Sequence, residues 1–463
     1  MRQGYGAAEM RAALLVIALT ACDVGSVPSR PTPAGSEPAV HVYVASALPV
    51  LTRAGGEPAL APVTKPAPGA APLFEGGMSA LASTGAELWT ITDRGPNVDV
   101  SGLAVPGGGA FPKHTKFFPL PAYNQAILRL AAADDGSFSV VERLGVTRAG
   151  QPTNGLPSNR PGRTTREHAF GPELRADPGA ELAPSPLGYD FEGIGLDVGP
   201  GGQRTYWVAD EYGPSIARLD AQGRMVAEWV PGVPPSGEGT TGDPSVAPLP
   251  AVLRQRRDNR GFEGLAVTRE SVFAIVESTL APDGGASGEH GHGNEHTRLH
   301  RLVRLDKTSG AVTMFAYEHD ADIERIGLRH GDVRIGDLTA LGPDGSSLLV
   351  YEHDAHKHHA RFFRVRLDGA TPLDPAAGAA YEAGGASYAP VRKELVYDFA
   401  PVLARLPTPA KCEGVAVSGA RTLWLVFDND YGLTDDEGIR MRDDVTVRSL
   451  LVRVDFPGAA LAP

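Results

Sequence analysis

The chain has 463 residues, of which 42% are hydrophobic, so it can bury a large core in one big fold or in two domains. Its 55 acidic residues exceed its 43 basic ones and give a net charge of -12, which argues against a nucleic-acid partner because phosphate neutralisation needs a basic face. The 56 Gly and 40 Pro residues fall between apolar runs, a pattern typical of many short strands joined by turns.

The first residues are typical of an exported lipoprotein. The apolar run over residues 12–19 is too short to span a bilayer, and it ends in LTAC, which resembles the lipobox of bacterial lipoproteins. We predict a signal peptide over residues 1–22, lipidation of Cys22, a Ser-, Pro- and Gly-rich tether over residues 23–39, and a place in the bacterial cell envelope, on the periplasmic or outer-surface side. An ordinary secretory signal with a chance cysteine is the alternative. Lipidation would leave Cys412 unpaired, and we predict it as a small buried residue rather than a nucleophile.

Five segments then repeat one pattern, in which an acid opens an apolar strand and a second acid closes the next strand. They are FEGG with LWTITD (74–93), FEGI with TYWVAD (191–210), FEGL with VFAIVE (262–277), IGDL with LLVYE (335–352) and CEGV with LWLVFD (412–428). The second, third and fourth units continue with two more apolar strands behind turn signals such as AQGR and DKTSG.

Four-stranded antiparallel units repeated about an axis are typical of a β-propeller. We therefore predict an all-β propeller of four-stranded antiparallel blades over residues 40–456. It has five blades, or six if the interval between residues 102 and 189 holds a further partial blade rather than a long loop. The last unit is one strand short, and the strand over residues 41–47 is predicted to complete it. A β-sandwich with a second domain is the alternative topology.

The acids of each unit lie symmetrically about its hairpin turn, as Glu192 and Asp210 do about Gly201. Residues equidistant from such a turn lie opposite each other, so the acids would gather at one face around the axis. Crowded carboxylates raise each other's pKa unless a cation or basic side chains compensate. Ca²⁺ fits best, because it takes oxygen ligands at flexible geometry and the repeated positions offer no His or Cys set for zinc.

The predicted calcium ligands are the acids that open four of the units: Glu75, Glu192, Glu263 and Glu413. Asp93 and Asp210 are predicted as further ligands or as the general base. Asp337 departs from the pattern, because Gly-Asp replaces Glu-Gly in its unit, and it is a weaker candidate. The alternative interpretation is that each acid accepts hydrogen bonds from backbone amides of a neighbouring blade and has a structural role alone.

Basic and amide residues adjoin the same acids, at Arg94 and Asn97 in DRGPN and at Asn259 and Arg260 before the third unit. An Arg fork beside a bound cation suits a phosphate or carboxylate ester, so we predict these four residues as substrate-binding. Pairing with the excess acids is the alternative.

Taken together, the FEG strands, DRGPN, DEYGP, NRGFEGLA and DNDYG resemble the family called esterase-like activity of phytase, over roughly residues 74–456. The resemblance implies an exported propeller related in architecture to calcium-dependent phytases. No catalytic residue is carried over from the family position by position.

We therefore predict an exported calcium-dependent hydrolase of phosphate or related esters, in which the metal positions the ester oxygen and lowers the pKa of the attacking water. It would act on a small-molecule ester as a monomer and would contact the membrane through its lipid anchor alone. Two alternatives stay open: a lactonase of the gluconolactonase type, and a non-catalytic propeller that binds a ligand or partner. No G-x-S-x-G, Walker or H-E-x-x-H motif supports another hydrolase class.

Overall fold

A computed structural model describes residues 37–51, 73–103, 109–160, 167–171, 181–232, 244–281, 296–354, 358–406, 411–434, 440–441 and 449–463. Over these residues the protein is almost entirely β, and the prediction of an all-β fold is confirmed. The single α-helix described, α1 (Ala400–Leu403), is one turn long, and none of the described helices has the length and apolar character needed to cross a membrane. The predicted signal peptide and Cys22 lie outside the described residues.

Three sheets follow each other along the chain, each with its strands in sequence order. The first contains β12 (Phe191–Val198), β13 (Arg204–Asp210), β14 (Ser215–Leu219) and β15 (Met225–Pro231), with β16 (Ser245–Leu249) added in parallel. The second contains β17 (Phe262–Val267), β18 (Ser271–Val276), β19 (Leu299–Asp306) and β20 (Val312–Glu318). The third contains β21 (Val333–Ala340), β22 (Ser347–Asp354), β23 (Ala360–Arg366) and β24 (Arg392–Asp398).

An eight-stranded sheet joins the two ends of the chain. Its order is β2 (Ala82–Ser83), β3 (Leu88–Ile91), β6 (Ala126–Ala132), β7 (Ser137–Gly145), β1 (Ala39–Ala47), β29 (Leu450–Asp455), β26 (Thr422–Asp428) and β25 (Lys411–Ser418). The N-terminal strand β1 pairs antiparallel with β29, as predicted, and also parallel with β7. This sheet is nearly closed, because its two end strands pack against each other.

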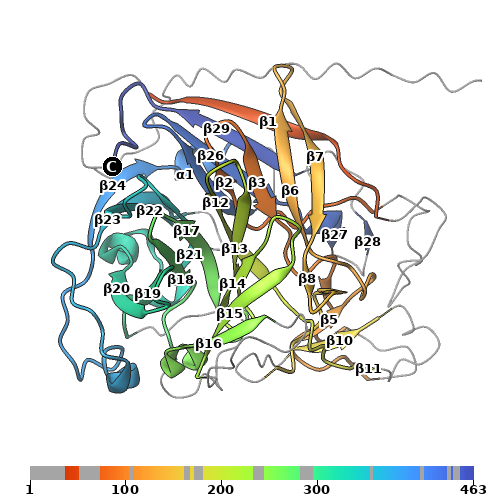
Figure 1. Ribbon diagram of the computed structural model, residues 1–463, viewed down its shortest axis with the longest axis horizontal. Coiled ribbons are helices and arrows are strands. Elements are labelled where there is room, and N and C mark those ends of the chain that lie inside the picture. Colours follow the sequence, from red (N-terminus) through yellow and green to blue (C-terminus); the bar gives the residue numbers. More distant parts are fainter. Residues whose placement is uncertain are drawn as a thin grey trace, which may run out of the picture.

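Contacts between the first strands of the five units close into a ring, and Figure 1 labels β2, β12, β17 and β21 among these strands. β2 packs against β12, β12 against β17, β17 against β21, β21 against β25, and β25 against β2. Each pair of neighbouring units shares a hydrophobic cluster; Trp207 and Phe262, for example, belong to the cluster between the sheets that begin with β12 and β17. Burial of this kind supplies the main driving force for the assembly.

The long first interval contributes two features. The strands β6 and β7 complete the first unit. A separate small sheet is made of β4 (Val98–Asp99) and β5 (Thr115–Phe117), which precede β6, and of β10 (His168–Phe170) and β11 (Glu181–Leu182), which follow β7. The interval also contains the two-stranded β8 (Thr147–Arg148) and β9 (Gln151–Pro152). It therefore contains short strands as well as the predicted loop.

A β-bulge explains the recurring Glu-Gly pair. In β12, β17 and β25 the pairing register skips one residue, which is Glu192, Glu263 or Glu413. A bulge turns such a side chain away from the regular pleat. The glycine that follows meets the neighbouring first strand, and a Cβ on Gly264 would lie 2.5 Å from the amide nitrogen of Leu338. The acid thus needs the bulge, and the close strand contact needs the glycine.

This contact leads to a testable expectation for Gly264→Ala. The added methyl group must push backbone atoms of β21 aside, so we expect a loss of roughly 1–3 kcal/mol in the free energy of unfolding, measured by chemical denaturation. Gly458→Ala is the control, because nothing lies within 4 Å of a Cβ at that exposed position. Equal stability of the two variants would contradict the proposed role of the close approach.

Candidate metal and ester site

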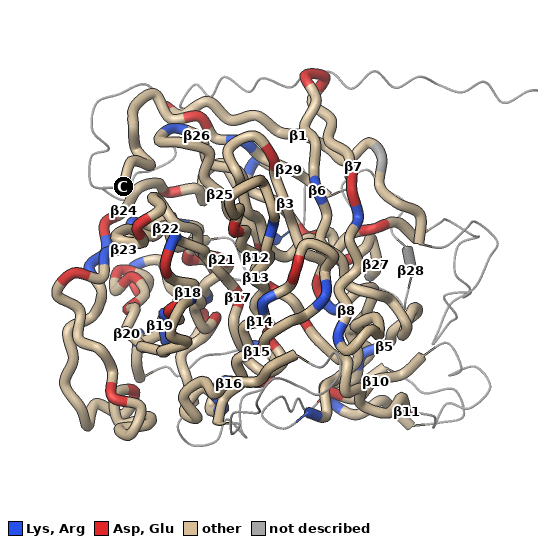
Figure 2. Tube along the Cα trace, in the orientation of Figure 1, with Lys and Arg blue, Asp and Glu red and all other residues tan. Residues whose placement is uncertain are grey.

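A cavity of about 240 Å³ opens where the first strands begin and the second strands end. Its wall holds nine carboxylates and five basic side chains, many of them buried. The acids are Asp93, Glu192, Glu211, Glu263, Glu277, Asp354, Glu413, Asp428 and Asp430, and the bases are Arg94, Lys116, Arg260, Arg334 and Lys411. Figure 2 colours these acidic and basic positions along the trace. Such crowding of both signs inside one cavity is typical of a functional site.

The acids after the second strands occupy equivalent places in three units. The amide of Asp93 donates to Gly77 O, that of Glu211 to Asp190 O, and that of Glu277 to Gly261 O, each at 2.8 Å. Glu211 therefore lines the cavity in the second unit. The neighbouring Asp210, the predicted ligand or base, is not among the lining residues, and its carboxylate accepts from Asp190 N at 2.8 Å and from Ser215 Oγ at 3.3 Å.

Two groups of three acids lie close enough to hold a metal ion, and they share Glu211. One is Asp190, Glu192 and Glu211, and the other is Glu211, Glu263 and Glu277; within each group one oxygen per residue lies within 4.8 Å of the others. All five side chains are buried. Asp190, Glu211 and Glu277 extend the predicted ligand set, which contained Glu192 and Glu263 from these groups.

Three of these five carboxylates have a buried oxygen without a hydrogen-bond partner among the described residues, and one of these oxygens, Asp190 Oδ2, forms an ion pair with Arg94. Glu192 Oε2 and Glu263 Oε2 are buried and have no hydrogen-bond partner in the described part of the protein. Burial and the neighbouring acids raise the pKa of both carboxyls well above the usual range. A buried carboxylate oxygen without a partner is costly, and a hard cation removes that cost. The donor set, which is all oxygen, therefore fits an ion such as Ca²⁺.

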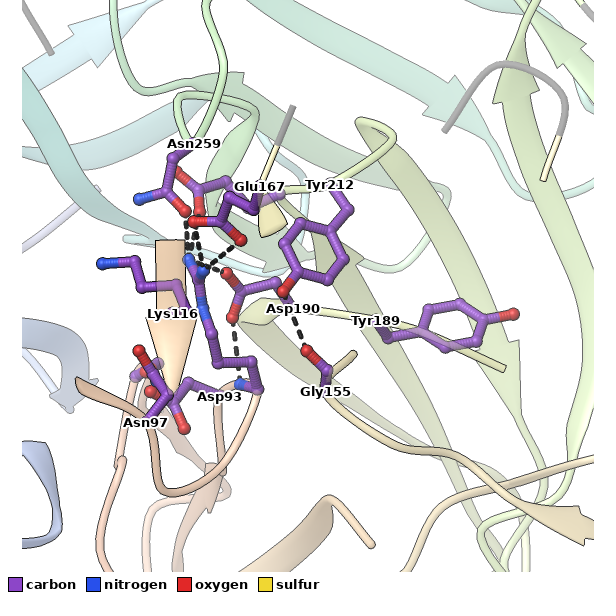
Figure 3. Close-up of polar contacts among 12 residues, drawn as sticks. Asp93, Asn97, Lys116, Gly155, Glu167, Tyr189, Asp190, Tyr212 and Asn259 are labelled. Carbon is purple, nitrogen blue, oxygen red and sulfur yellow. Dashed lines mark hydrogen bonds and ion pairs between the residues drawn. The ribbon is translucent and has the colours of Figure 1, made fainter. Parts of the chain in front are cut away.

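Arg94 lines the cavity and is paired with acids and an amide; Figure 3 labels its partners Glu167, Asp190 and Asn259. Its Nη1 donates to both oxygens of Glu167 at 2.8 Å, and its Nη2 pairs with Asp190 and Asn259 and lies 3.4 Å from Glu211. Three acids and one amide group thus take most of its donors. These contacts are the ones expected if Arg94 pairs with the excess acids, which the sequence analysis gave as the alternative to substrate binding.

The other predicted substrate-binding residues also line the cavity. Asn97 Nδ2 donates to Gly95 O at 2.9 Å, which closes a turn, and Asn259 adopts a left-handed conformation with φ 54. Strain of this kind in a non-glycine residue is concentrated at functional sites. Asp430, also on the cavity wall, has φ 47.

Glu413 belongs to a second acidic part of the wall, with Asp428 and Asp430. Lys411 Nζ lies 3.2 Å from Asp430 and 3.9 Å from Glu413. Burial raises the pKa of Glu413 to about 7, although Lys411 opposes the shift. Asp93 lies near this group, and burial together with Asp190 raises its pKa well above the usual range.

Glu75 and Asp337 lie outside the cavity wall. Glu75 accepts hydrogen bonds from Tyr123 and from Arg143, whose Nε lies at 2.7 Å, so its charge already has a partner. Gly77, whose carbonyl accepts from the amide of Asp93, takes the place that Asp190 and Gly261 have in the next two units. The FEG motif that contains Glu75 therefore lies before the strand position of Glu192 and Glu263. Cys412 is buried and its thiol pKa is raised by burial, which matches the prediction of a small buried residue.

Asp337 occupies the place that glycine has in the other units, because the fourth unit has Gly336 at its bulge. Its two oxygens accept from the amides of Leu338 and Val415, each at 2.7 Å. Burial raises its pKa, and these amides with those of Leu81 and Leu265 oppose the shift. This carboxylate therefore joins first strands through their backbones, which is the structural alternative stated for the acids.

The fold and the cavity define an all-β protein with a buried acidic site able to hold a metal ion. The family model described as phytase-like, esterase-like activity of phytase, matches residues 75–431. The chain belongs to this family.

Other matches are weaker. An uncharacterized secreted protein of Arthroderma benhamiae is 25% identical over 189 residues, which cover 37% of this chain and 35% of that protein. Among solved structures, the Synechocystis apocarotenoid oxygenase is 12% identical, with 80% of this chain and 79% of that one covered at a TM-score of 0.30. A xyloglucanase from Xanthomonas campestris is 13% identical, with 79% of this chain and 46% of that one covered at a TM-score of 0.29. These structural overlaps are too low to bear on the fold or the activity of this chain.

Proposed function

We propose that this protein is a calcium-dependent hydrolase of phosphate or related esters, with the cation held at the buried acids of the cavity. The observation that carries the proposal is the pair of unsatisfied oxygens, Glu192 Oε2 and Glu263 Oε2, in two acid groups linked by Glu211. Membership of a family described by esterase-like activity supports the reaction class.

We also infer that the ring of first strands is the centre of a five-bladed β-propeller. Three observations support this inference: the five first strands pack in a closed order, the sheets share hydrophobic clusters pairwise, and β1 completes the last unit beside β29. A propeller gathers the ends of its inner strands around one axis, which accounts for the convergence of acids from separate units. The domain boundaries at residues 22, 39 and 456 stay predictions.

Within the cavity, Glu192, Glu211 and Glu263 would hold the cation, with Asp190 and Glu277 as the remaining members of their groups. The bound ion would polarise an ester oxygen and lower the pKa of a nearby water. Asp93 is the better placed of the two predicted bases, because it lines the cavity whereas Asp210 is hydrogen-bonded outside it. Its carboxylate accepts from Gly95 N at 2.7 Å and from Tyr431 Oη at 3.1 Å, which fixes its orientation.

Export is part of the proposal. The secreted relative supports it, as does the N-terminal segment with its lipobox-like LTAC. Lipidation of Cys22, anchoring in the cell envelope and a monomeric state are proposals that rest on the sequence alone.

Hydrolysis by the purified protein tests the activity. We expect calcium-stimulated turnover of at least one class in a panel of phosphomonoesters, phytate and simple carboxyl esters, and a fall of roughly 100-fold or more in kcat for Asp93→Asn, because a positioned general base contributes about that factor. Turnover of lactones alone would favour the gluconolactonase-type alternative. A folded, calcium-loaded protein inactive on every substrate would favour the non-catalytic one.

A further inference from the structure

The fourth unit has an acid at neither of the two positions from which other units direct carboxylates into the cavity. Its bulge residue is Gly336, where the third unit has Glu263. The residue that pairs with the position two before the bulge is His353, where the third unit has Glu277. A glycine and an imidazole thus replace two carboxylates, and His353 lines the cavity.

Gly336 leaves room for two stacked rings. A Cβ on this glycine would lie 2.8 Å from Cδ1 of Tyr351 and 3.0 Å from Cδ2 of His353. The centroids of the two rings are 5.3 Å apart and their planes are inclined by 8°, an offset parallel arrangement that aromatic rings favour. Tyr351 therefore covers one face of the imidazole, and no other described ring stacks on His353.

The side chains around this pair are apolar. Tyr351, Leu403 and Cys412 line the cavity and belong to one hydrophobic cluster, which packs the third sheet against the eight-stranded sheet. All three are almost fully buried, so the partly exposed ring of His353 is the accessible surface there. Every other lining residue is an acid, a base or an asparagine. We call Tyr351, His353, Leu403 and Cys412 the neutral sector of the cavity wall.

His353 itself carries no charge near neutral pH. Burial lowers its pKa to about 3, and the charge of Arg334 adds to that shift. Its Nδ1 lies 3.4 Å from the carbonyl oxygen of Asp354, and because a carbonyl only accepts, Nδ1 holds the proton. The two flanking charges have protein partners: Arg334 Nη1 lies 3.9 Å from Glu277, and Asp354 accepts from His359 N at 2.7 Å.

We propose that the outer face of His353, with Leu403 and Cys412 beside it, is the subsite for an aromatic ring of the substrate. The inference rests on the proposed ester hydrolysis and names its substrate class, the esters of aromatic alcohols, because the alcohol is the uncharged part of a phosphate ester. A flat neutral ring stacks on such a face. A sugar ring would need hydrogen-bond partners for its hydroxyls, which Leu403 and Cys412 do not supply.

The subsite adjoins the proposed cation position. Ile335, beside the bulge of the fourth unit, donates its amide to the carbonyl oxygen of Glu277 at 3.0 Å. Glu277 belongs to the group with Glu211 and Glu263 that can hold a cation. An ester bound to that cation would have its alcohol part in the same cavity as His353, one unit further around the ring. Ligand pockets often combine an apolar wall with a few polar groups in this way.

Saturation-transfer difference NMR titrations with benzyl alcohol, in buffer with calcium, test the subsite without turnover. We expect the wild type to bind benzyl alcohol more tightly than cyclohexylmethanol, whose ring is similar in size but not flat. His353→Ala should weaken benzyl alcohol binding at least about threefold, because the stacked ring is lost, and His353→Phe, which keeps a flat ring, should stay within about twofold of the wild type. His41→Ala is the matched control, since His41 lies on β1 beside Asp455 and is not a lining residue.

The comparison of the two alcohols in the wild type needs no variant, and a cooperative melting transition shows that each variant is folded. Equal affinity for the two alcohols, no detectable binding of benzyl alcohol, or equal benzyl alcohol affinity in wild type and His353→Ala would overturn the inference. Tighter binding of methyl glucoside would also overturn it.

Failure of the proposed activity would look different. Ring-dependent binding by a protein that hydrolyses no ester would leave the subsite standing and remove the enzyme. Hydrolysis with equal kcat/KM for benzyl and cyclohexylmethyl esters, unchanged in His353→Ala, would keep the enzyme and remove the subsite.

Discussion

Calcium is expected to raise the melting temperature of the wild-type protein, and the Glu263→Gln variant is expected to lose most of that rise. An ion that binds the native state alone stabilises it by about 3 kcal/mol at a hundredfold excess over its Kd. Glu263 has a buried oxygen without a hydrogen-bond partner, so the amide removes ligand charge with little change of shape. In chelator the variant should be about as stable as the wild type or slightly more stable, because one buried charge is gone. Differential scanning calorimetry with calcium and with chelator measures both quantities.

Glu382→Gln is the matched control for this experiment. Glu382 is also fully buried, but Arg301 holds it through two hydrogen bonds of 2.6 Å outside the cavity. This variant should be destabilised with and without calcium and should keep the full calcium-induced rise. A melting curve of the wild type that ignores both calcium and chelator would remove the metal hypothesis.

The calcium effect should grow with pH. The pKa of Glu413 is raised to about 7 by burial, and those of Glu192 and Glu263 are also raised. Each folded carboxyl then binds more protons than its unfolded form, so without a cation the free energy of unfolding falls as pH rises from about 4.5 to about 7. A bound cation favours the ionised forms and opposes this fall. The difference in melting temperature between samples with calcium and samples with chelator should therefore increase as pH rises, and melting curves at several pH values measure it.

The sequence was sufficient to predict the all-β class and the shared strand position of Glu192, Glu263 and Glu413, because a repeated bulge with a Glu-Gly pair leaves a clear pattern. Counting residues from the turn was less reliable for the closing acids. Asp210 and Glu211 are adjacent, successive side chains of a strand alternate in direction, and the cavity is lined by Glu211. A sequence offers no way to decide between two adjacent acids when the register is shifted by a bulge.

Glu75 and Arg334 were beyond sequence reasoning for a different reason. Glu75 belongs to an FEG motif like the others, yet Tyr123 and Arg143 from a distant part of the first unit take up its carboxylate. Arg334 carries no motif at all, and its place is defined by pairing with His353 at the end of β22. In both cases the position is decided by contacts within one unit between residues that are distant in the sequence.

Asp337→Ala is expected to cause the largest loss of stability among the acids at the ring. The carboxylate accepts from the amides of Leu338 and Val415, each at 2.7 Å, and is almost fully buried. Alanine would leave both amides without an acceptor inside the protein, at a cost of about 2–5 kcal/mol in the free energy of unfolding. Asp337→Asn keeps one acceptor oxygen and should lie between alanine and the wild type. Urea denaturation measures the series.

The calcium dependence of this series separates a structural acid from a ligand. Asp337 is not a lining residue of the cavity, so both variants should keep the calcium-induced rise in melting temperature that Glu263→Gln loses. Asp344→Ala is the control, because Asp344 is an exposed acid that accepts from Ser346 within a turn, and its removal should change stability little. If Asp337→Asn folded with wild-type stability but lost its response to calcium, Asp337 would belong with Glu192 and Glu263 as a ligand, and the joining of first strands would have to come from packing alone.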